Sequence, residues 1–373
     1  MAAVSVVVGQ AFRLSPLALG AAISLITFVT AAVATPAGLW LRGKDARRWL
    51  AAGLAVMAVA GGAVALVPPS TVALICLRTI EGIGYLLIVV GGPGALAGQV
   101  SVSRRPAALA LWGACTPAGL AVSAVAGGFA AGSGGWREWF AVLAIMCAGL
   151  AGVMTMPARG NARAAPAATT ASAQGRGNLA APLLLACGFG ALSLMTVAIV
   201  SLLPSYLSTQ MGMSVTAAGA TTAVVAAASI PGNACAAILL RRGVRPGLLA
   251  CSMLACPALA AAAFAAATPL PARVGAAAAL IFAVGIAASG AYASLPRVTR
   301  RIDDLPVANG VMIQLGSLGA LTGPPILAAI TGLRHWQLTG YLVTPAAVLS
   351  AAAMAAATMF PVTAGHARRG MRR

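Results

Sequence analysis

Long, uninterrupted apolar stretches dominate this sequence and restrict what it can fold into. Eleven of them reach the length of about 20 residues that carries an α-helix across a bilayer. Open strands are excluded at that depth because their edges would leave backbone groups unpaired, and the stretches are too uniformly apolar for barrel strands. The sequence therefore predicts an all-α polytopic membrane protein with spans near 16–41, 49–68, 71–98, 107–131, 138–157, 179–203, 214–240, 247–268, 273–295, 307–331 and 338–360.

Composition argues against the soluble alternatives. Of the 373 residues, 60% are hydrophobic and only 8% are charged, whereas a soluble domain carries about 25% charged residues. A cytosolic enzyme, a nucleic-acid-binding domain and a disordered chain are therefore excluded. The seven cysteines lie in apolar runs without a CxxC pair, so we interpret them as small buried hydrophobes and expect no metal and no cofactor.

The basic residues are divided unevenly between alternate loops. The formal net charge is +19, from 24 basic and 5 acidic residues. Most basic residues fall in the loops at 42–48, 104–105, 159–176, 241–245 and 297–301 and in the tail at 368–373, whereas the alternate loops hold only Arg13, Arg137, Arg273 and Arg334. This asymmetry is the positive-inside pattern. We therefore predict that the first set of loops and the C-terminus are cytoplasmic, and that lipid, rather than nucleic acid, is the partner of this basic chain.

One long polar stretch, residues 158–178, is rich in Ala, Gly, Ser and Thr and is interpreted as a flexible cytoplasmic linker. It separates a predicted N-terminal bundle (1–157) from a C-terminal bundle (179–361), which is followed by a basic tail (362–373). Residues 1–9 are too few to cross a membrane, yet the charge pattern fits if they form the outer half of a first helix. We hypothesise that the start lies upstream or that the first helix is truncated.

Two local patterns carry a resemblance to a known family. The loop Gly38-Leu-Trp-Leu-Arg42-Gly-Lys-Asp45-Ala-Arg47-Arg48 is similar to the motif Gly-x-x-x-Asp-Arg-x-Gly-Arg-Arg, with Arg42 in place of the Asp and Asp45 in place of the second Gly. The fourth helix carries Arg78-x-x-Glu81-Gly82-x-Gly84, which is similar to Arg-x-x-Gln-Gly-x-Gly. Together with the plan of six helices, linker and six helices, they make the chain resemble the major facilitator superfamily over essentially its whole length.

The resemblance extends to proline and glycine positions. Gly319-x-x-x-Gly323-Pro324 is similar to the family's antiporter signature, although it lies in the eleventh helix, and the fifth helix has Pro117 without the preceding Gly. The stretch from Asn309 to Pro324 resembles bacterial cyanate-permease and metabolite- or drug-efflux members. By matching motifs, the resemblance implies a conformational or gating role for Gly38, Asp45, Arg47, Arg48, Gly82, Gly84, Pro117, Gly323 and Pro324.

Arg78 and Glu81 are the charged pair that the predicted spans place at bilayer depth, where a charge is costly and by default functional. Three residues apart on a helix, they share a face and can pair. We expect them to line a central cavity, with Arg78 binding an anionic group or tuning Glu81; the alternative is a fixed pair that orders the fourth helix. Tyr85 lies on the same face. The resemblance also places Trp112, Tyr292, Asn309 and Gln314 on cavity-lining helices, with a packing role as the alternative.

The implied function is secondary transport of a small molecule by a monomeric carrier in the bacterial inner membrane. The sequence has no nucleotide-binding element, so a gradient must supply the energy, and the proton is the candidate ion because Glu81 is the one membrane acid. An enzyme is disfavoured because both histidines, His335 and His366, lie outside the spans. The alternative function is a truncated, transport-defective membrane protein with a sensor role or no independent role.

Overall fold

The computed structural model describes residues 4–132, 135–156, 180–299 and 302–359, and these residues contain helices and no strand. The elements before residue 157 are α1 (Ser5–Ala11), α2 (Pro16–Leu41), α3 (Ala46–Leu66), α4 (Thr71–Gln99), the 3₁₀ turn η2 (Val102–Arg104), α5 (Arg105–Gly132) and α6 (Trp136–Thr155). Those after residue 179 are α7 (Ala180–Met211), α8 (Val215–Ala227), α9 (Ser229–Arg241), η3 (Pro246–Ala255), α10 (Cys256–Phe264), α11 (Leu270–Val298), η4 (Ile302–Asp304), α12 (Leu305–Thr331), η5 (Trp336–Thr339) and α13 (Gly340–Met359).

In the described part of the chain, eleven helical segments are long and apolar enough to cross a membrane, which confirms the predicted all-α fold with eleven full spans. Two spans are less regular than expected. The span predicted at 214–240 is divided into α8 and α9 near Ala228, just before Pro231. The span predicted at 247–268 begins as the 3₁₀ helix η3 and becomes α-helical at Cys256, beside Pro257. Proline has no backbone N–H to donate, so each break lies where a helical hydrogen bond cannot form.

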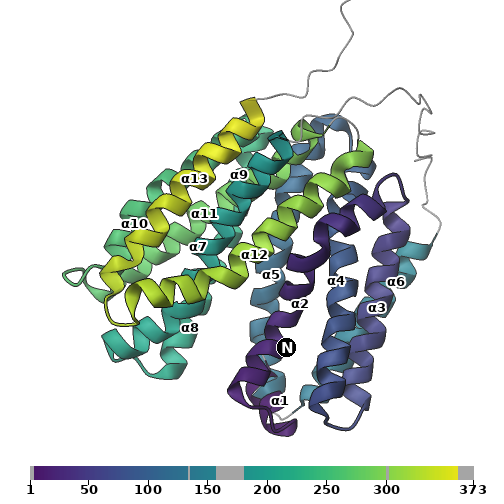
Figure 1. The fold of residues 1–373 in the computed structure, drawn as a ribbon, viewed down its shortest axis with the longest axis horizontal. Helices are drawn as coiled ribbons and strands as arrows, with labels where there is room; N and C mark the ends of the chain where they lie inside the picture. Colours follow the sequence, from purple (N-terminus) through teal and green to yellow (C-terminus); the bar gives the residue numbers. More distant parts are fainter. Residues whose placement is uncertain (1–3, 133–134, 157–179, 300–301, 360–373) are drawn as a thin grey trace, which may run out of the picture.

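The short helix α1 (Ser5–Ala11) lies at the end of the molecule where α2 begins (Figure 1). Val8 and Phe12 are buried there against the ends of α3, α4 and α6, and the Phe12 and Trp136 rings meet edge to face with centroids 5.4 Å apart. Ser15 then starts α2, as its sequence predicts, because its hydroxyl accepts from the Ala18 amide at 3.2 Å.

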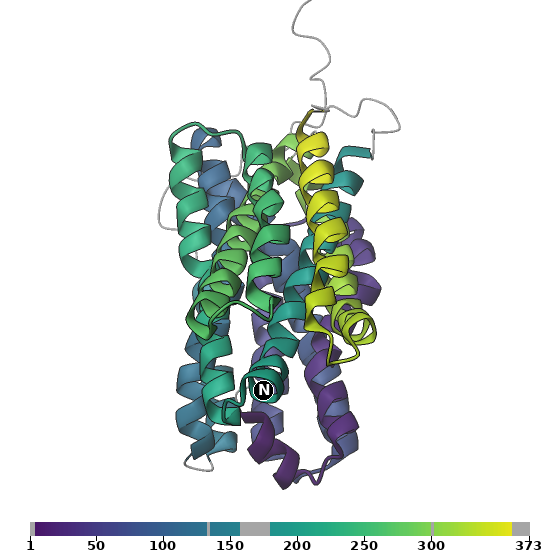
Figure 2. The same ribbon diagram turned by 90° about the vertical axis from the view of Figure 1, so that its left-hand side faces the viewer.

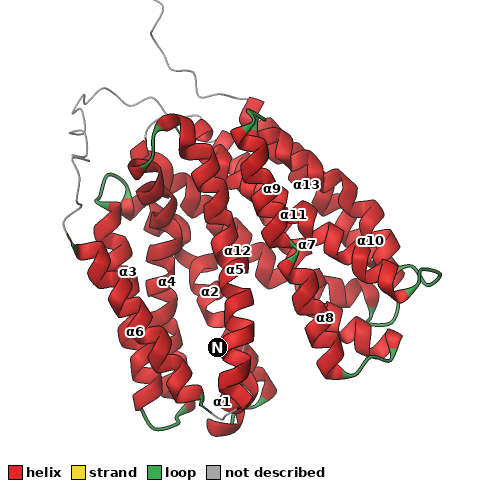
Figure 3. Ribbon diagram, turned by 180° about the vertical axis from the view of Figure 1, so that it is seen from behind, coloured by secondary structure: helices red, strands yellow, loops and turns green. Residues whose placement is uncertain are grey.

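The helices form two groups, α1–α6 and α7–α13, that lie side by side (Figure 1). The view turned by 90° shows the long helices of both groups running in broadly the same direction (Figure 2). The groups come together where α2 ends and α12 begins and diverge toward the opposite end, where α1 and α8 lie, as the view from behind also shows (Figure 3). Contacts between the groups join α2 to α12 and α5 to α9 and α11.

Helices α2 and α12 run antiparallel. Their contact, which we call the α2–α12 seam, is formed by residues 30–42, at the end of α2, and by residues 304–317, at the start of α12. A Cβ built on Gly310 would lie 2.5 Å from the Ala34 carbonyl oxygen, so only glycine allows this approach. Thr30 and Ser317 close the seam with a hydroxyl contact of 2.8 Å. Beyond it the two groups diverge toward the end where α1 and α8 lie (Figure 1). The molecule is therefore closed at what we call the basic end, where the loops after α2, before α5, after α9 and before α12 lie.

Gly319 and Gly323 pack within the C-terminal group. A Cβ on Gly319 would lie 3.0 Å from the Leu194 amide nitrogen, and one on Gly323 would meet the Leu194 backbone and, at 3.3 Å, the Ala198 methyl group. Both glycines thus let α12 approach α7 at backbone distance, the usual use of small residues four apart in membrane helices. The structure places Gly323 at this contact and not at the contact between the two groups.

This packing predicts opposite effects for two identical substitutions. Gly323→Ala inserts a methyl group into the α7 backbone contact, and overpacking of this kind costs about 1–3 kcal/mol of unfolding free energy. Gly275→Ala on α11 meets nothing within 4 Å and should be neutral or stabilising by about 0.5–1 kcal/mol. Thermal unfolding of the two purified variants measures the difference in stability. Equal melting temperatures would show that the α7–α12 contact does not limit the stability of the protein.

Candidate functional site

The Arg78–Glu81 pair forms, and it lies inside the N-terminal group. The two side chains make an ion pair three residues apart on α4 and are only 8% and 7% exposed. Arg78 Nε also donates to the Ala22 carbonyl of α2 at 3.2 Å. A Cβ on Gly61 of α3 would lie 3.2 Å from Glu81 Oε1, so α3 covers the carboxylate. All these contacts come from α2, α3 and α4, and none comes from α7–α13.

The neighbouring motif residues have local packing roles in the same group. Gly82 faces Val29 of α2, with a built Cβ 3.1 Å from the valine Cβ, and Gly84 faces α3, with a built Cβ 2.7 Å from the Gly53 carbonyl oxygen. The motif Arg78-x-x-Glu81-Gly82-x-Gly84 therefore lets α4 pack closely on two helices while it buries an ion pair between them.

Four other predicted site residues, Tyr85, Trp112, Tyr292 and Gln314, lie on helices that take part in the contact between the two groups. Tyr85, one turn beyond Glu81, Trp112 and Tyr292 belong to one apolar cluster. Tyr292 packs edge to face on Phe189, with centroids 5.7 Å apart. Gln314 reaches across the α2–α12 seam, where its Oε1 accepts from the Thr35 amide at 3.0 Å and its Nε2 donates to the Ala32 carbonyl at 3.2 Å.

A second polar contact joins the groups between α5, α9 and α11, and sequence reasoning missed it. Ser289 of α11 lies 2.6 Å from Asn233 Oδ1 of α9 and 3.0 Å from the Ala110 carbonyl of α5. Gly113 allows this approach because a Cβ there would lie 3.2 Å from the Tyr292 ring. Asn233 and Ser289 carry no motif, so only the pairing of helices α5 and α11 could have identified them.

The predicted gating residues of the loop after α2 have separate contacts. Gly38 lies on the α2–α12 seam, where a Cβ would be 3.1 Å from the Val307 Cα. Asp45 caps α3 by accepting from the Arg47 amide at 3.0 Å and pairs with Arg48 at 3.3 Å. Arg47 donates to the last carbonyls of α6, Val153 at 3.2 Å and Met156 at 2.6 Å. Only Gly38 among these four meets the C-terminal group through the contacts described.

Arg42, the residue that replaces the motif's Asp, makes the ion pair between the groups. Its Nη2 lies 2.7 Å from Asp304 Oδ1, immediately before α12. Asp304 also lies at a helix N-terminus, where negative charge is favoured. The polarity of this contact is therefore basic on the α2 side and acidic on the α12 side, and it lies at the end of the α2–α12 seam.

Pro117 and Pro324 are both interior helix residues, in α5 and α12. Each removes one backbone hydrogen bond from its helix. Neither lies on the α2–α12 seam defined above.

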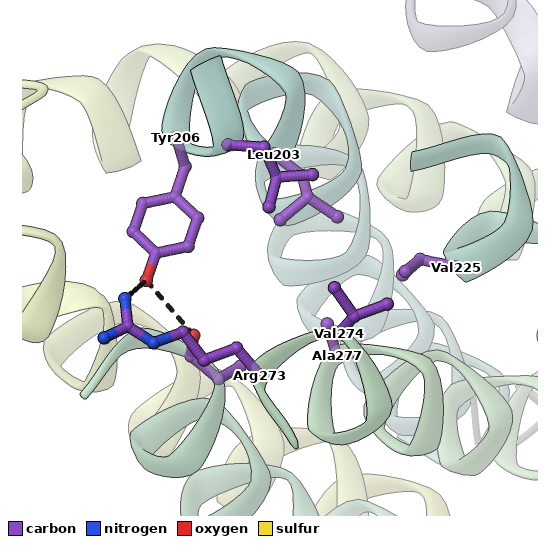
Figure 4. A pocket seen from close by; sticks show the side chains of 8 residues that line it. Leu203, Tyr206, Val225, Arg273, Val274 and Ala277 are labelled. Atoms are coloured by element: carbon purple, nitrogen blue, oxygen red, sulfur yellow. Dashed lines mark hydrogen bonds between the residues drawn. The ribbon is translucent and has the colours of Figure 1, made fainter. Parts of the chain in front are cut away.

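Arg273, the first residue of the predicted span 273–295, is a further buried charge whose partners the sequence does not indicate. It lies in the first turn of α11 and is 7% exposed. Its guanidinium donates to Thr268 O at 2.5 Å, Ala266 O at 2.6 Å and Tyr206 Oη at 2.6 Å. Figure 4 shows the guanidinium pointing at Tyr206, with Leu203, Val225, Val274 and Ala277 on the apolar side. The cavity there holds about 10 Å³, room for about one water, so Arg273 ties the loop before α11 to α7.

The geometry of the Arg78–Glu81 pair predicts how its members behave separately and together. Arg78→Leu or Glu81→Leu leaves one buried charge unpaired, which costs about 3–5 kcal/mol of unfolding free energy, whereas the double Leu variant removes both charges and should recover most of that loss. Thermal unfolding in detergent measures all three. A double variant as unstable as the worse single variant would contradict a locally paired role.

The sequence was compared with known proteins and structures. Residues 1–271 and, in a second match, residues 184–370 match the Major Facilitator Superfamily. A search of curated proteins gives no match. Similar solved structures include the transporter FucP in its outward conformation (TM-score 0.72, 14% identity, covering 96% of this chain and 93% of that one) and the proton:xylose symporter XylE bound to 6-bromo-6-deoxy-D-glucose (0.71, 16%, 93% and 90%).

A bacterial homologue of the iron transporter ferroportin in its outward-facing state is similar as well (0.69, 13%, 96% and 97%). At these identities the likeness shows the shared fold, and the family match covers nearly the whole chain. The chain belongs to the Major Facilitator Superfamily of multi-pass membrane transporters.

Proposed function

We propose that this protein is a secondary transporter that moves a small molecule by alternating access, with the basic end facing the cytoplasm of a bacterium. The observation that carries the proposal is the α2–α12 seam, where the groups are in contact from the Arg42–Asp304 ion pair to the Thr30–Ser317 contact, and beyond which they diverge (Figure 1). In this arrangement a site between the groups communicates with the end opposite the basic loops. Rocking of the two groups would reverse the accessible side.

The closing contacts are of a kind that can be broken repeatedly. They consist of glycine approaches, a few hydrogen bonds and one ion pair in which Arg42 is 57% exposed. An exposed ion pair contributes only about 0–1 kcal/mol. A seam built from such contacts favours closure without fixing it.

The substrate site in this proposal lies between the two groups beyond the seam, and Tyr85, Trp112, Tyr292 and Gln314 line it. The coupling ion is the proton, because Glu81 is a buried acid within the span α4, whereas Glu138, in the first turn of α6, is exposed. Glu81 lies inside the N-terminal group and is paired with Arg78. It would act by parting from Arg78 during the cycle, so the same pair both holds α4 in place and carries the coupling.

Transport itself is the first test. A thermal-shift screen of the purified protein against small metabolites and drugs identifies a ligand, and counterflow into proteoliposomes then measures its movement. We expect Arg78→Ala to abolish transport in protein that still inserts, and Glu81→Gln to abolish proton-driven accumulation while leaving counterflow. Uphill, proton-driven transport by Glu81→Gln would remove Glu81 from the coupling step, and full activity of Arg78→Ala would remove Arg78 from the mechanism.

The ion pair at the basic end predicts a charge-swap result. Asp304→Arg places two cations at the 2.7 Å contact with Arg42, so it should open the basic end, whereas Arg42→Asp combined with Asp304→Arg restores an attractive pair and should close it again. Spin labels at Ser103→Cys and Arg242→Cys, one on each group, report the separation in a background without the seven natural cysteines. Failure of the double variant to recover the short distance would show that the contact does not control closure.

A further inference from the structure

Two interior prolines interrupt the hydrogen bonding of helices in the N-terminal group. Pro36 lies inside α2 and Pro93 inside α4. In an α-helix each N–H bonds the carbonyl four residues earlier, and proline has no N–H. Pro36 therefore frees the carbonyl of Ala32, and Pro93 frees the carbonyl of Val89. In a membrane protein such freed groups must find other partners.

Both freed carbonyls receive an amide from one helix of the other group. Asn309 of α12 donates through Nδ2 to Val89 O at 2.8 Å and to Val90 O at 3.1 Å. Gln314, also on α12, donates through Nε2 to Ala32 O at 3.2 Å. Its Oε1 accepts from the amide of Thr35, the residue before Pro36, at 3.0 Å, so the carboxamide holds the α2 backbone through both a carbonyl and an amide.

This coincidence is particular to α12 in the part of the chain that the structure describes. Other helices with interior prolines include α5, α7, α11 and α13. Among the described hydrogen bonds, no side-chain amide reaches the carbonyl four residues before Pro117, Pro204, Pro296 or Pro345. Among the described residues, carboxamide capping of a proline-freed carbonyl therefore occurs where α12 contacts the helices of the N-terminal group.

We propose that Asn309 and Gln314 are positioning residues that hold the basic end closed by capping the proline-freed carbonyls of α4 and α2. The inference rests on the proposed alternating access and adds a closing role to the substrate contact proposed for Gln314. When the groups rock apart at the basic end, both carbonyls lose their amide donors and must be hydrated instead. Opening of this end is thereby tied to the entry of water.

One atom explains why such a contact stays reversible. Asn309 is fully buried, and among the described residues its Oδ1 has no hydrogen-bond partner. A buried polar atom without a partner loses the hydration that it has when exposed. Opening gives Oδ1 water at the same time as it takes the carbonyls from Nδ2, so the two effects oppose each other.

The test is a mutant cycle read by the distance between labels at Ser103→Cys and Arg242→Cys in the full chain, reconstituted in nanodiscs and measured by pulsed EPR. Asn309→Leu keeps the side-chain volume and removes the donor, and we expect the ratio of open to closed populations to rise at least threefold. Pro93→Ala restores a backbone N–H that can bond to the Val89 carbonyl. In that background, the factor by which Asn309→Leu changes the ratio should therefore be at least three times smaller. Gln314→Leu with Pro36→Ala forms the parallel cycle on α2.

The matched control is Thr322→Val, which removes a hydrogen bond of α12 to its own Leu318 carbonyl and none to the other group. It should leave the ratio unchanged. Two populations in the parent protein that neither Asn309→Leu nor Gln314→Leu alters would overturn the capping role and leave alternating access standing. One fixed distance in the parent and in every variant would contradict alternating access, and the capping role with it. If Asn309→Leu does not fold, the Gln314 cycle decides.

Discussion

The constraint on which the rest of this structure depends is the pairing of backbone N–H and carbonyl groups where there is no water. Long helices satisfy it almost everywhere, which is why apolar stretches of about 20 residues become helices and not strands. The exceptions lie at prolines and helix ends, and there side chains take over. Arg273 and Arg47 bind carbonyls at the ends of neighbouring elements, and Asn309 and Gln314 bind carbonyls that Pro93 and Pro36 set free.

Helix packing follows a second, related rule. Gly38 and Gly310 allow α2 and α12 to meet across the two groups, whereas Gly319 and Gly323 allow α12 to meet α7 within one group. Lipid tails are as apolar as most side chains, so close backbone approach and interhelical hydrogen bonds provide the association energy. One helix, α12, thus carries a permanent contact with α7 along one stretch and a breakable contact with α2 along another.

The sequence predicts the spans well because hydrophobic length alone decides them, and it predicts the start of α2 because Ser15 is a local cap. It predicts the surroundings of a side chain less well where residues far away in the sequence supply its partners. Arg273 is the first residue of a predicted span, and the sequence does not indicate that Tyr206 and the loop carbonyls are its partners. Arg78 and Glu81 are predictable as a pair from their spacing, but their enclosure by α2 and α3 depends on Gly61 and Ala22, residues without any motif. Pro36 and Pro93 could have signalled two carbonyls in need of donors, and Asn309 and Gln314 were the amides available.

The antiparallel course of α2 and α12 also has a mechanical consequence. From Thr30 to Arg42 there are twelve residues, about 18 Å along a helix axis, and Thr30 touches Ser317 where the helices begin to part. A turn of one group about that contact acts on a lever of this length. A rotation of about 10° would separate Arg42 from Asp304 by roughly 3 Å and move Gln314, close to the pivot, far less. The contacts of the seam would therefore break in sequence, from the ion pair inward.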